Sequence, residues 1–429
     1  MFRKTILFVL AILLLCGGTC VPADGATADK TDTAEGRADK TYDQLKLLLD
    51  ILAYTQQNYV DEIDTQKLIY SAASGMLRPL DPFSQFMEPR IFNEMKIETE
   101  GKYGGLGIRI SLRDNWLTVI TPMPGTPAAK IGILPGDKII GIEGVSTQGI
   151  TMEEAVKKLR GDPGTKVKIT VARDGMKEPV DFEITREIIK LESLRSKLLE
   201  GEIGYVHLLE FNNNSEEDIK KAMRDLENKG MKSFILDLRN NPGGLLDVAV
   251  KITRMFLAEE KMIVYTRGRI PRSHMEYRAD KIAPWSDIPM AVLINRGSAS
   301  GSEIVAGALQ DHKRAVVVGS RTFGKASVQT ILPLQDGCAM KLTTAKYYTP
   351  AGRLIQVDTE TKKGGIEPDI KVDVSPEVEA KIQAQEEILY PDGKEPKDVA
   401  KDERPVDEVL HRATELLKAR DILLQLKKG

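Results

Sequence analysis

Two segments of the chain have the same succession of predicted strand, turn and helix, and this succession limits the folds that the chain can adopt. Ser233 to Leu238 (SFILDL) and Met290 to Ile294 (MAVLI) are short apolar runs of the kind that form buried strands. Each is followed by a turn of small and polar residues and then by apolar residues at helical spacing. Strand, turn and helix in succession predict a mixed α/β core, and both turns place backbone N–H groups at a helix start, where negative charge can be held.

The rest of the chain predicts further parts around this core. A chain of 429 residues is too long for one ordinary hydrophobic core, so two or three domains are expected. The fold class is therefore α+β and multidomain. The predicted parts are a signal peptide (1–28), a disordered leader (29–40), an N-terminal helical region (41–100), a β-rich inserted domain (101–188), a mixed α/β core (189–375) and a charged, partly helical C-terminal tail (376–429).

The N-terminus has the layout of a secretory signal. Arg3 and Lys4 precede an apolar run from Ile6 to Cys16, and small residues follow in 21–28. The run is shorter than the roughly 20 residues of a membrane span. We expect export, to the periplasm or the extracytoplasmic face of the membrane. An uncleaved anchor stays open, and a lipoprotein at Cys16 is disfavoured because Leu15 is not small.

Composition excludes several classes of site. The net charge of −2 gives no general electrostatic reason to expect a nucleic-acid partner. The four histidines are scattered and the three cysteines form no C-x-x-C pair, so neither a metal site nor a cofactor is expected.

The stretch VVVGSRTFGKASVQT, residues 316–330, almost matches a phosphate-binding loop. Ala326 lacks the hydroxyl that would bind magnesium, and residues 327–333 alternate like a strand where a helix is required. Nucleotide binding is therefore disfavoured, and a surface lysine in a strand-turn-strand is the simple alternative for Lys325.

The serine-rich turn also has a simple interpretation. Ser300 and Glu303 have the spacing of a capping box, in which a serine merely caps its helix. On local pattern alone, capping is the favoured role of Ser300, and Asn241-Pro242-Gly243-Gly244 is a tight turn.

Taken together, the motifs are more specific. DLRNNPGGLL, NRGSASGSEIVAGAL and GSRTFGKASVQT, in this order and spacing, resemble those of the carboxyl-terminal processing peptidases. The similarity runs from about Tyr42 to Val374 and includes GGIEPDIKV, residues 364–372. It implies an exported serine endopeptidase with a Ser-Lys dyad, in which residues 101–188 are a PDZ domain and 189–375 the peptidase core. The alternative is a PDZ peptide-binding scaffold whose core is catalytically inert.

The resemblance assigns roles residue by residue. It implies that Ser300 is the nucleophile, Lys325 the general base and Gln329 a support for the lysine. The N–H groups of Gly244 and Gly301 would form the oxyanion hole. Gly301 stands where the family more often has Ala, and Ala326 where it more often has Gly, but neither change removes a reacting group.

A lysine can act as a base only when it is neutral. The ordinary lysine pKa is about 10.4, and burial can lower it by up to 3–5 units. Phe323 and Val328 are expected to line such a pocket, and there is no acidic residue between Gly319 and Leu334.

The PDZ domain implies a way of choosing substrates. Such domains add a peptide as an extra strand and hold its C-terminal carboxylate with loop N–H groups. The loop here would be Gly105, Leu106, Gly107 and Ile108. By resemblance Arg160 couples peptide binding to the core, and the alternative is a solvated arginine at a helix end. Expected partners are proteins or peptides with free C-termini and no nucleic acid, with an adaptor protein and a homo-oligomer left open.

Overall fold

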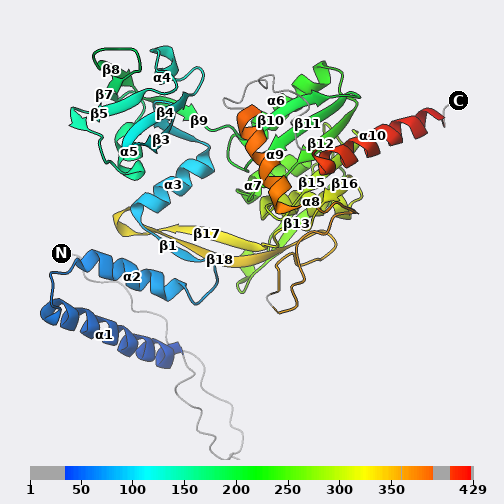
Figure 1. Ribbon diagram of the computed structural model, residues 1–429. Helices are drawn as coiled ribbons and strands as arrows, with labels where there is room; N and C mark the ends of the chain where they lie inside the picture. Colours follow the sequence, from blue (N-terminus) through cyan, green and yellow to red (C-terminus); the bar gives the residue numbers. More distant parts are fainter. Residues whose placement is uncertain (1–33, 359, 390–405, 427–429) are drawn as a thin grey trace, which may run out of the picture. The chain divides into compact units, whose positions relative to one another are not determined.

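The computed structural model describes residues 34–358, 360–389 and 406–426 (Figure 1). Contacts divide the chain into two compact units, residues 1–72 and 73–429. The predicted signal peptide lies outside the described residues. In the part of the chain that is described, no helix has both the length and the hydropathy needed to cross a membrane.

The N-terminal region is helical, as predicted. It contains α1 (Ala34–Asn58) and α2 (Thr65–Leu77). Helix α1 begins inside the stretch predicted as a disordered leader, so residues 34–40 of that prediction are wrong. The sequence there, AEGRADK, is polar but includes strong helix formers, and polarity by itself does not prevent a helix.

The β-rich domain is built on one antiparallel sheet. Its strand order is β3-β4-β5-β7-β8, with β6 paired to β5, so β3 lies at an edge. The elements are β3 (Ile108–Arg113), β4 (Trp116–Pro122), α4 (Pro127–Lys130), β5 (Lys138–Ile142), β6 (Val145–Ser146), α5 (Met152–Leu159), β7 (Lys166–Ala172) and β8 (Val180–Thr185). The buried side chains of Leu117, Ile139, Val167 and Ile169 form its separate core.

The chain enters and leaves this domain along one short ribbon. Strands β2 (Lys102–Gly105) and β9 (Glu187–Lys190) pair antiparallel, with Lys102 opposite Lys190 and Gly105 opposite Glu187. The entry and exit strands are therefore hydrogen-bonded to each other, on the side where the core begins.

The core contains a six-stranded sheet covered on both faces. Its order is β10-β11-β12-β15-β16-β19, parallel except for the antiparallel β10–β11 pair. The strands are β10 (Leu194–Leu199), β11 (Ile203–Leu208), β12 (Ser233–Asp237), β15 (Met290–Ile294), β16 (Val316–Gly319) and β19 (Ile370–Lys371). Burial on both faces explains why β12 and β15 are continuous apolar runs in the sequence.

Different helices cover the two faces of this sheet. The first face packs with α6 (Ser215–Asn228), α7 (Leu246–Arg254) and α8 (Gly301–Asp311). The second face packs with α10 (Glu408–Leu426) through Val409, Ala413 and Leu417. Helix α9 (Pro376–Leu389) precedes α10 (Figure 1). The C-terminal tail thus contributes to the core.

A second sheet joins segments from both sides of the inserted β-rich domain. Its order is β1-β18-β13-β14, and β17 also pairs with β18. Strand β1 (Gln85–Met87) lies beside the long β17 (Ser327–Pro333) and β18 (Ala339–Tyr348) hairpin (Figure 1). The remaining elements are β13 (Met262–Arg267), β14 (Glu276–Arg278), the short η2 (Pro271–Ser273) and η3 (Gln335–Gly337), and α3 (Pro89–Glu100), which connects β1 to β2.

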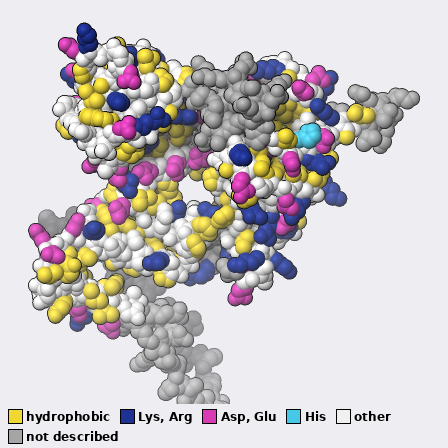
Figure 2. Space-filling model, viewed as in Figure 1, with side chains coloured by type: hydrophobic (Ala, Val, Ile, Leu, Met, Phe, Trp, Pro, Cys, Tyr) yellow, Lys and Arg dark blue, Asp and Glu magenta, His cyan; other side chains and the backbone are white. Residues whose placement is uncertain are grey.

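The fold class predicted from the sequence is confirmed: N-terminal helices, an inserted β-rich domain and a mixed α/β core. Strands β15 and β17 begin and end where the sequence pattern placed them. On the face in Figure 2, acidic and basic side chains are interspersed.

Candidate active site

Ser300 lies at the junction between a turn and a helix, in a strained conformation. Strand β15 ends at Ile294, a turn follows, and α8 begins at Gly301 with Ser300 as its N-cap at φ 53° and ψ −110°. A positive φ is uncommon for a residue with a β-carbon and costs on the order of 1–3 kcal/mol. Glu303 reaches back to the N–H of Ser300 at 2.9 Å, so the predicted capping box is present.

The three serines of this turn differ in what their hydroxyls do. Ser298 is fully buried, and its Oγ donates to the Leu238 carbonyl at 2.7 Å. Ser302 is also fully buried, and its Oγ donates to the Asn241 carbonyl at 3.0 Å. Both therefore bind the neighbouring turn that follows β12. Ser300 is half-buried and is the one of the three whose hydroxyl is not bonded to that turn.

Two side chains hold Ser300 and Lys325 together at the level of the backbone. Glu303 Oε2 accepts the N–H groups of both residues, each at 2.9 Å. The Tyr347 hydroxyl lies 3.1 Å from the Ser300 carbonyl and also contacts the Lys325 carbonyl. The structure therefore brings the predicted nucleophile and the predicted base into one site.

Burial governs the charge of both bridging groups. It raises the pKa of Glu303, against hydrogen bonds from the Thr322 hydroxyl and from backbone N–H groups that favour the carboxylate. It also raises the pKa of the Tyr347 hydroxyl, and the neighbouring Glu303 adds to this effect. The tyrosine therefore stays a neutral hydroxyl, which can donate a hydrogen bond to a carbonyl.

The amine of Lys325 sits between an aromatic ring and an amide. Nζ lies 4.7 Å from the centre of the Phe83 ring and 3.3 Å from Gln329 Oε1. In this geometry its hydrogen bond is to Gln329 and not to Ser300 Oγ. Burial lowers the pKa of Lys325, the cation of Lys341 lowers it further, and the carboxylates of Glu303 and Asp81 oppose the shift.

The surroundings of Lys325 differ from those predicted. Phe323 does not line the pocket, because its side chain is 55% exposed. The aromatic residue at the amine is Phe83, which lies far away in the sequence. The local segment has no acidic residue, but Glu303 supplies a carboxylate from α8. No sequence signal marked Phe83 or Tyr347 as part of the site.

The glycine turn after β12 packs directly against Ser300. Gly243 and Gly244 have φ of 100° and 140°, which disfavour any residue with a side chain. A β-carbon at Gly243 would lie 2.6 Å from Ser300 Cβ, and one at Gly244 would lie 2.2 Å from the Phe211 carbonyl oxygen. Within the described chain, the N–H groups of Gly244 and Gly301 donate no backbone hydrogen bond. Neither N–H group is therefore used by the backbone of the described residues.

An ion-pair network anchors the start of that turn. Arg239 is buried and pairs with Asp237 at 2.6 Å and with Asp407 at 2.8 Å. Burial by itself would lower the pKa of Arg239, but the two carboxylates raise it well above its ordinary value. Asp407 also accepts the Leu410 N–H at 3.0 Å at the start of α10. The C-terminal helix is thereby tied to the turn that carries Gly243 and Gly244.

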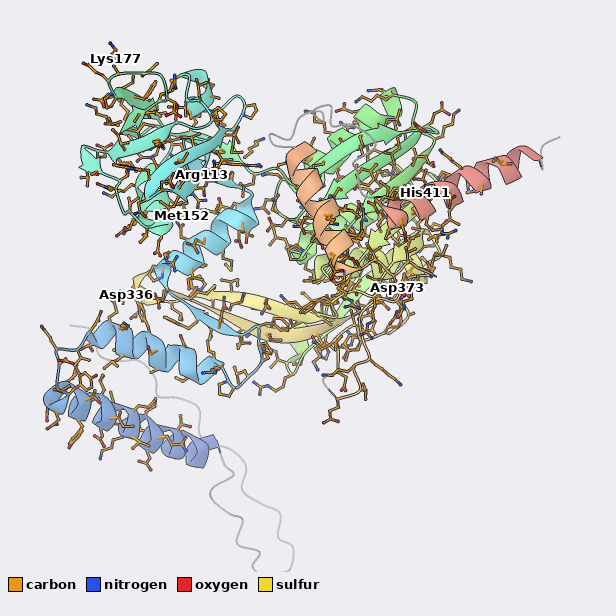
Figure 3. All side chains as sticks on the ribbon, in the orientation of Figure 1. Arg113, Met152, Lys177, Asp336, Asp373 and His411 are labelled. Carbon is orange, nitrogen blue, oxygen red and sulfur yellow. The ribbon has the colours of Figure 1, made fainter. Side chains whose placement is uncertain are left out.

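The predicted carboxylate loop lies at the start of an edge strand. Gly105 ends β2, Leu106 is buried, and Ile108 begins β3. Gly107 has φ 73°, and its carbonyl accepts the Met123 N–H at 2.7 Å, which explains why the strand does not start earlier. Strand β3 and helix α5 pack into the same core cluster, and Figure 3 labels Arg113 and Met152 on these two elements.

Arg160 is not a freely solvated helix-end residue. It is the C-cap of α5, and its guanidinium carbon lies 4.4 Å from the centre of the Tyr103 ring in β2. It therefore connects the helix beside the edge strand with the ribbon that leads to the core.

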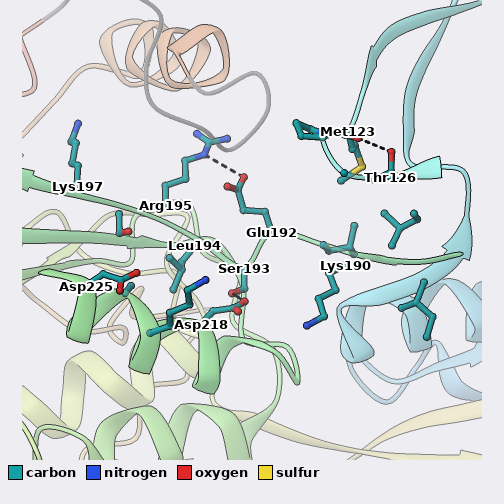
Figure 4. Close-up of a pocket in the computed structure, with 18 of the residues that line it drawn as sticks. Met123, Thr126, Lys190, Glu192, Ser193, Leu194, Arg195, Lys197, Asp218 and Asp225 are labelled. Carbon is teal, nitrogen blue, oxygen red and sulfur yellow. Dashed lines mark hydrogen bonds and ion pairs between the residues drawn. The ribbon is translucent and has the colours of Figure 1, made fainter. Parts of the chain in front are cut away.

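A further cleft lies elsewhere in the described chain. It has a volume of about 1410 Å³ and is lined by the loop 123–126, by residues 187–198 and by one side of α6 (Figure 4). Glu192 and Arg195 approach within 3.9 Å there. Ser300 and Lys325 are not among its lining residues, so the cleft is separate from the candidate active site.

The described residues contain no group of three or more His, Cys, Asp or Glu side chains arranged to hold a metal ion.

Comparison with known proteins agrees with the motifs. The profile of peptidase family S41 matches residues 202–372, and that of the PDZ domain matches residues 118–173. A carboxy-terminal-processing protease of Bartonella bacilliformis is 42% identical over 377 residues, which cover 87% of this chain and 83% of that protein. A carboxyl-terminal-processing protease of Synechocystis sp. is 35% identical over 373 residues, or 81% of this chain and 85% of that protein. Among solved structures, a photosystem II D1 C-terminal processing protease is 31% identical with a TM-score of 0.43, covering 76% of this chain and 92% of that one.

Proposed function

The chain belongs to the carboxy-terminal processing proteases of peptidase family S41, which are serine-type proteases, and from this premise we propose that Ser300 and Lys325 form its catalytic dyad. One observation carries the proposal. Glu303 Oε2 and the Tyr347 hydroxyl each contact the backbone of both Ser300 and Lys325, and the backbone of Ser300 is held at positive φ. Such a geometry is costly for a serine that only caps a helix.

The first step is the attack of Ser300 on the scissile carbonyl. A serine hydroxyl is a poor nucleophile until a base takes its proton. Because burial lowers the pKa of Lys325, a larger fraction of the amine is neutral near pH 7 than for an exposed lysine. Lys325 Nζ takes the proton as Oγ attacks, and Gln329 Oε1, at 3.3 Å in the free protein, accepts a hydrogen bond from the ammonium that results.

The negative charge that develops on the carbonyl oxygen is held by the N–H groups of Gly244 and Gly301. Such donors are each worth roughly 10²–10³ in turnover. Lys325 then returns its proton to the leaving amine, and water releases the acyl group from Ser300. The reaction is thus acyl transfer and needs no cofactor.

The PDZ domain binds the substrate. Strand β3 is at the sheet edge, so a peptide can pair with it while its C-terminal carboxylate meets the loop from Gly105 to Ile108. We propose that protein or peptide chains with free C-termini bind there and are cleaved near that end by the dyad. Arg160, stacked on Tyr103, is proposed to relay binding to the core.

Localisation and partners complete the proposal. The N-terminal pattern supports export to the periplasm or the extracytoplasmic face of the membrane. Leucines of α1, such as Leu45 and Leu49, are exposed, and a homo-oligomer or an adaptor protein would cover them. N-terminal sequencing of the mature protein should begin between Val21 and Lys30. Recovery of only full-length protein from the cytosol would contradict export.

The dyad is tested by exchanging the serines one at a time. Ser300→Ala should abolish cleavage of a peptide, and Lys325→Arg should do the same because a guanidinium is not deprotonated. Ser298→Ala is the matched control: it loses a buried hydrogen bond and some stability but keeps turnover. Normal turnover of Ser300→Ala would refute the assignment. Tight peptide binding without cleavage by the unmodified protein would favour the inert scaffold.

A further inference from the structure

A short turn before β1 is fixed by its own side chains. Asp81 Oδ1 accepts the N–H groups of Phe83 at 2.7 Å and Ser84 at 2.8 Å. Its other oxygen accepts the Ser84 hydroxyl at 2.7 Å. Three hydrogen bonds to one carboxylate hold residues 81–84 in a single shape, which we call the DPFS turn.

The DPFS turn is fastened to the hairpin that follows Lys325. Ser84 Oγ accepts the Thr343 N–H at 3.1 Å. Directly after the turn, β1 pairs with β18, with Gln85 opposite Lys341 and Met87 opposite Ala339. Met87 and Ala339 are fully buried. A turn with both internal and external bonds of this kind has little freedom to move away from the hairpin.

Phe83 is linked to Lys325 directly through its ring and indirectly through Gln329. Its ring centre lies 4.7 Å from Lys325 Nζ. Its carbonyl accepts Gln329 Nε2 at 2.7 Å, and the oxygen of the same amide accepts the lysine amine at 3.3 Å. The hydrogen bond to Phe83 therefore settles which end of the Gln329 amide faces Lys325.

On the premise that Ser300 and Lys325 form the dyad, we propose that Phe83 is a positioning residue for the general base. Its ring keeps water from the amine and stabilises the ammonium formed when Nζ takes the serine proton, and its carbonyl orients Gln329. Cleavage therefore depends on a segment that precedes the PDZ domain in the sequence.

The ring acts on the charge of the amine in two opposite directions. Excluding water favours the neutral amine, whereas the face of an aromatic ring attracts a cation. Other charges face the amine from each neighbouring element: Lys341 on β18 disfavours the ammonium, and Glu303 on α8 and Asp81 in the DPFS turn favour it. Substitutions that keep or remove the apolar volume separate the two effects of the ring.

Three variants of the full-length protein make this separation. In each variant, kcat and kcat/KM are measured as a function of pH. Phe83→Leu keeps apolar volume but loses the ring face, so the plateau value of kcat should fall roughly tenfold. The rise of the rate on the acidic side of the profile should not move to higher pH. Phe83→Ala admits water, so the acidic limb of kcat/KM should move by about one unit toward the ordinary lysine value. Phe83→Tyr keeps both volume and ring and should restore the profile of the unmodified protein.

The matched control is Phe323→Leu. Phe323 is close to Lys325 in the sequence, but its side chain is 55% exposed and does not line the lysine pocket. Its substitution should change neither the acidic side nor the plateau of the pH–rate profile. Thermal unfolding of each variant identifies any loss of activity that is due to loss of the folded state. If Phe83→Ala does not fold, the plateau of Phe83→Leu tests the role of the ring.

The outcomes separate this inference from the proposed function. If Ser300→Ala is inactive while Phe83→Leu and Phe83→Ala keep the profile of the unmodified protein, the positioning role of Phe83 is wrong and the dyad stands. If Ser300→Ala turns over normally, the dyad itself is wrong. A lower plateau in Phe83→Leu, together with restoration by Phe83→Tyr, supports the role of the ring.

Discussion

Asp407→Ala should destabilise the peptidase core by an amount that the structure allows us to divide into two parts. Asp407 binds Arg239 through both carboxylate oxygens, each at 2.8 Å, and their side chains are only 18% and 11% exposed. It also accepts the Leu410 N–H at the start of α10. The substitution therefore removes a nearly buried ion pair and a helix cap together.

The two contributions have different sizes. Removing one partner of a buried pair costs about 3–5 kcal/mol when the other charge is left uncompensated. Asp237 still pairs with Arg239, so we expect the low end of that range or below, about 2 kcal/mol. Loss of the cap adds about 1 kcal/mol, for a total of about 3 kcal/mol. Asp407→Asn keeps a good cap but loses the charge, so it should cost about 2 kcal/mol.

The assay uses a tryptophan in the core as its reporter. The chain has two tryptophans, Trp116 in the PDZ domain and Trp285 in the core, where Trp285 is buried. In a Trp116→Phe background, urea unfolding followed by fluorescence reports on the core alone. Glu408→Ala, on the next and exposed residue of α10, is the matched control and should stay within about 0.5 kcal/mol of the unmodified protein.

The reasoning fails if Asp407→Asn is as stable as the unmodified protein, because the ion pair would then contribute nothing. It also fails if Asp407→Ala and Glu408→Ala lose the same free energy of unfolding.

Other substitutions and conditions test the site itself. Gly243→Ala should lower turnover roughly 100-fold with an unchanged circular dichroism spectrum, since its β-carbon would meet Ser300 Cβ at 2.6 Å, and a normal rate would contradict the close packing. Because burial lowers the pKa of Lys325 and a base works when neutral, kcat/KM should rise with pH and level off below the ordinary lysine pKa of 10.5; a limb at or above that value would contradict it. Tyr347→Phe should lower kcat roughly tenfold by releasing the Ser300 and Lys325 carbonyls, and an unchanged kcat would show that the hydroxyl does not hold them. Amidation of a substrate's C-terminus should lower kcat/KM for an unchanged scissile bond, and equal rates would argue against carboxylate capture by the PDZ loop.

Local patterns were enough to predict most of the elements. Strands β12 and β15 are recognisable because both of their faces are buried, which leaves an uninterrupted apolar run. The turns after them are recognisable because backbone at positive φ selects glycine, as at Gly243 and Gly244. The order of these motifs was specific enough to indicate the family.

The same local view could not find what surrounds Lys325. It pointed to Phe323, two residues away, whose side chain is exposed. The aromatic contact comes from Phe83, whose carbonyl binds a glutamine 246 residues further along the chain. A contact of this kind depends on how β1 pairs with β18, and no sequence window around either residue contains that pairing. The role of Asp407 was hidden for the same reason.

The ion pair between Arg239 and Asp407 also has a consequence for the order in which the core is completed during synthesis. The two residues are 168 positions apart, so at typical rates of 5–20 residues per second Asp407 is made roughly 8–34 s after Arg239. Until then the turn that carries Gly243 and Gly244 lacks one of its two anchors, and α10 cannot cover its face of the sheet. On the proposed assignment, a growing chain already contains Ser300 and Lys325 before the turn beside Ser300 has both of its anchors. Helix α10 can therefore complete the anchoring of this turn only after the turn itself has been made.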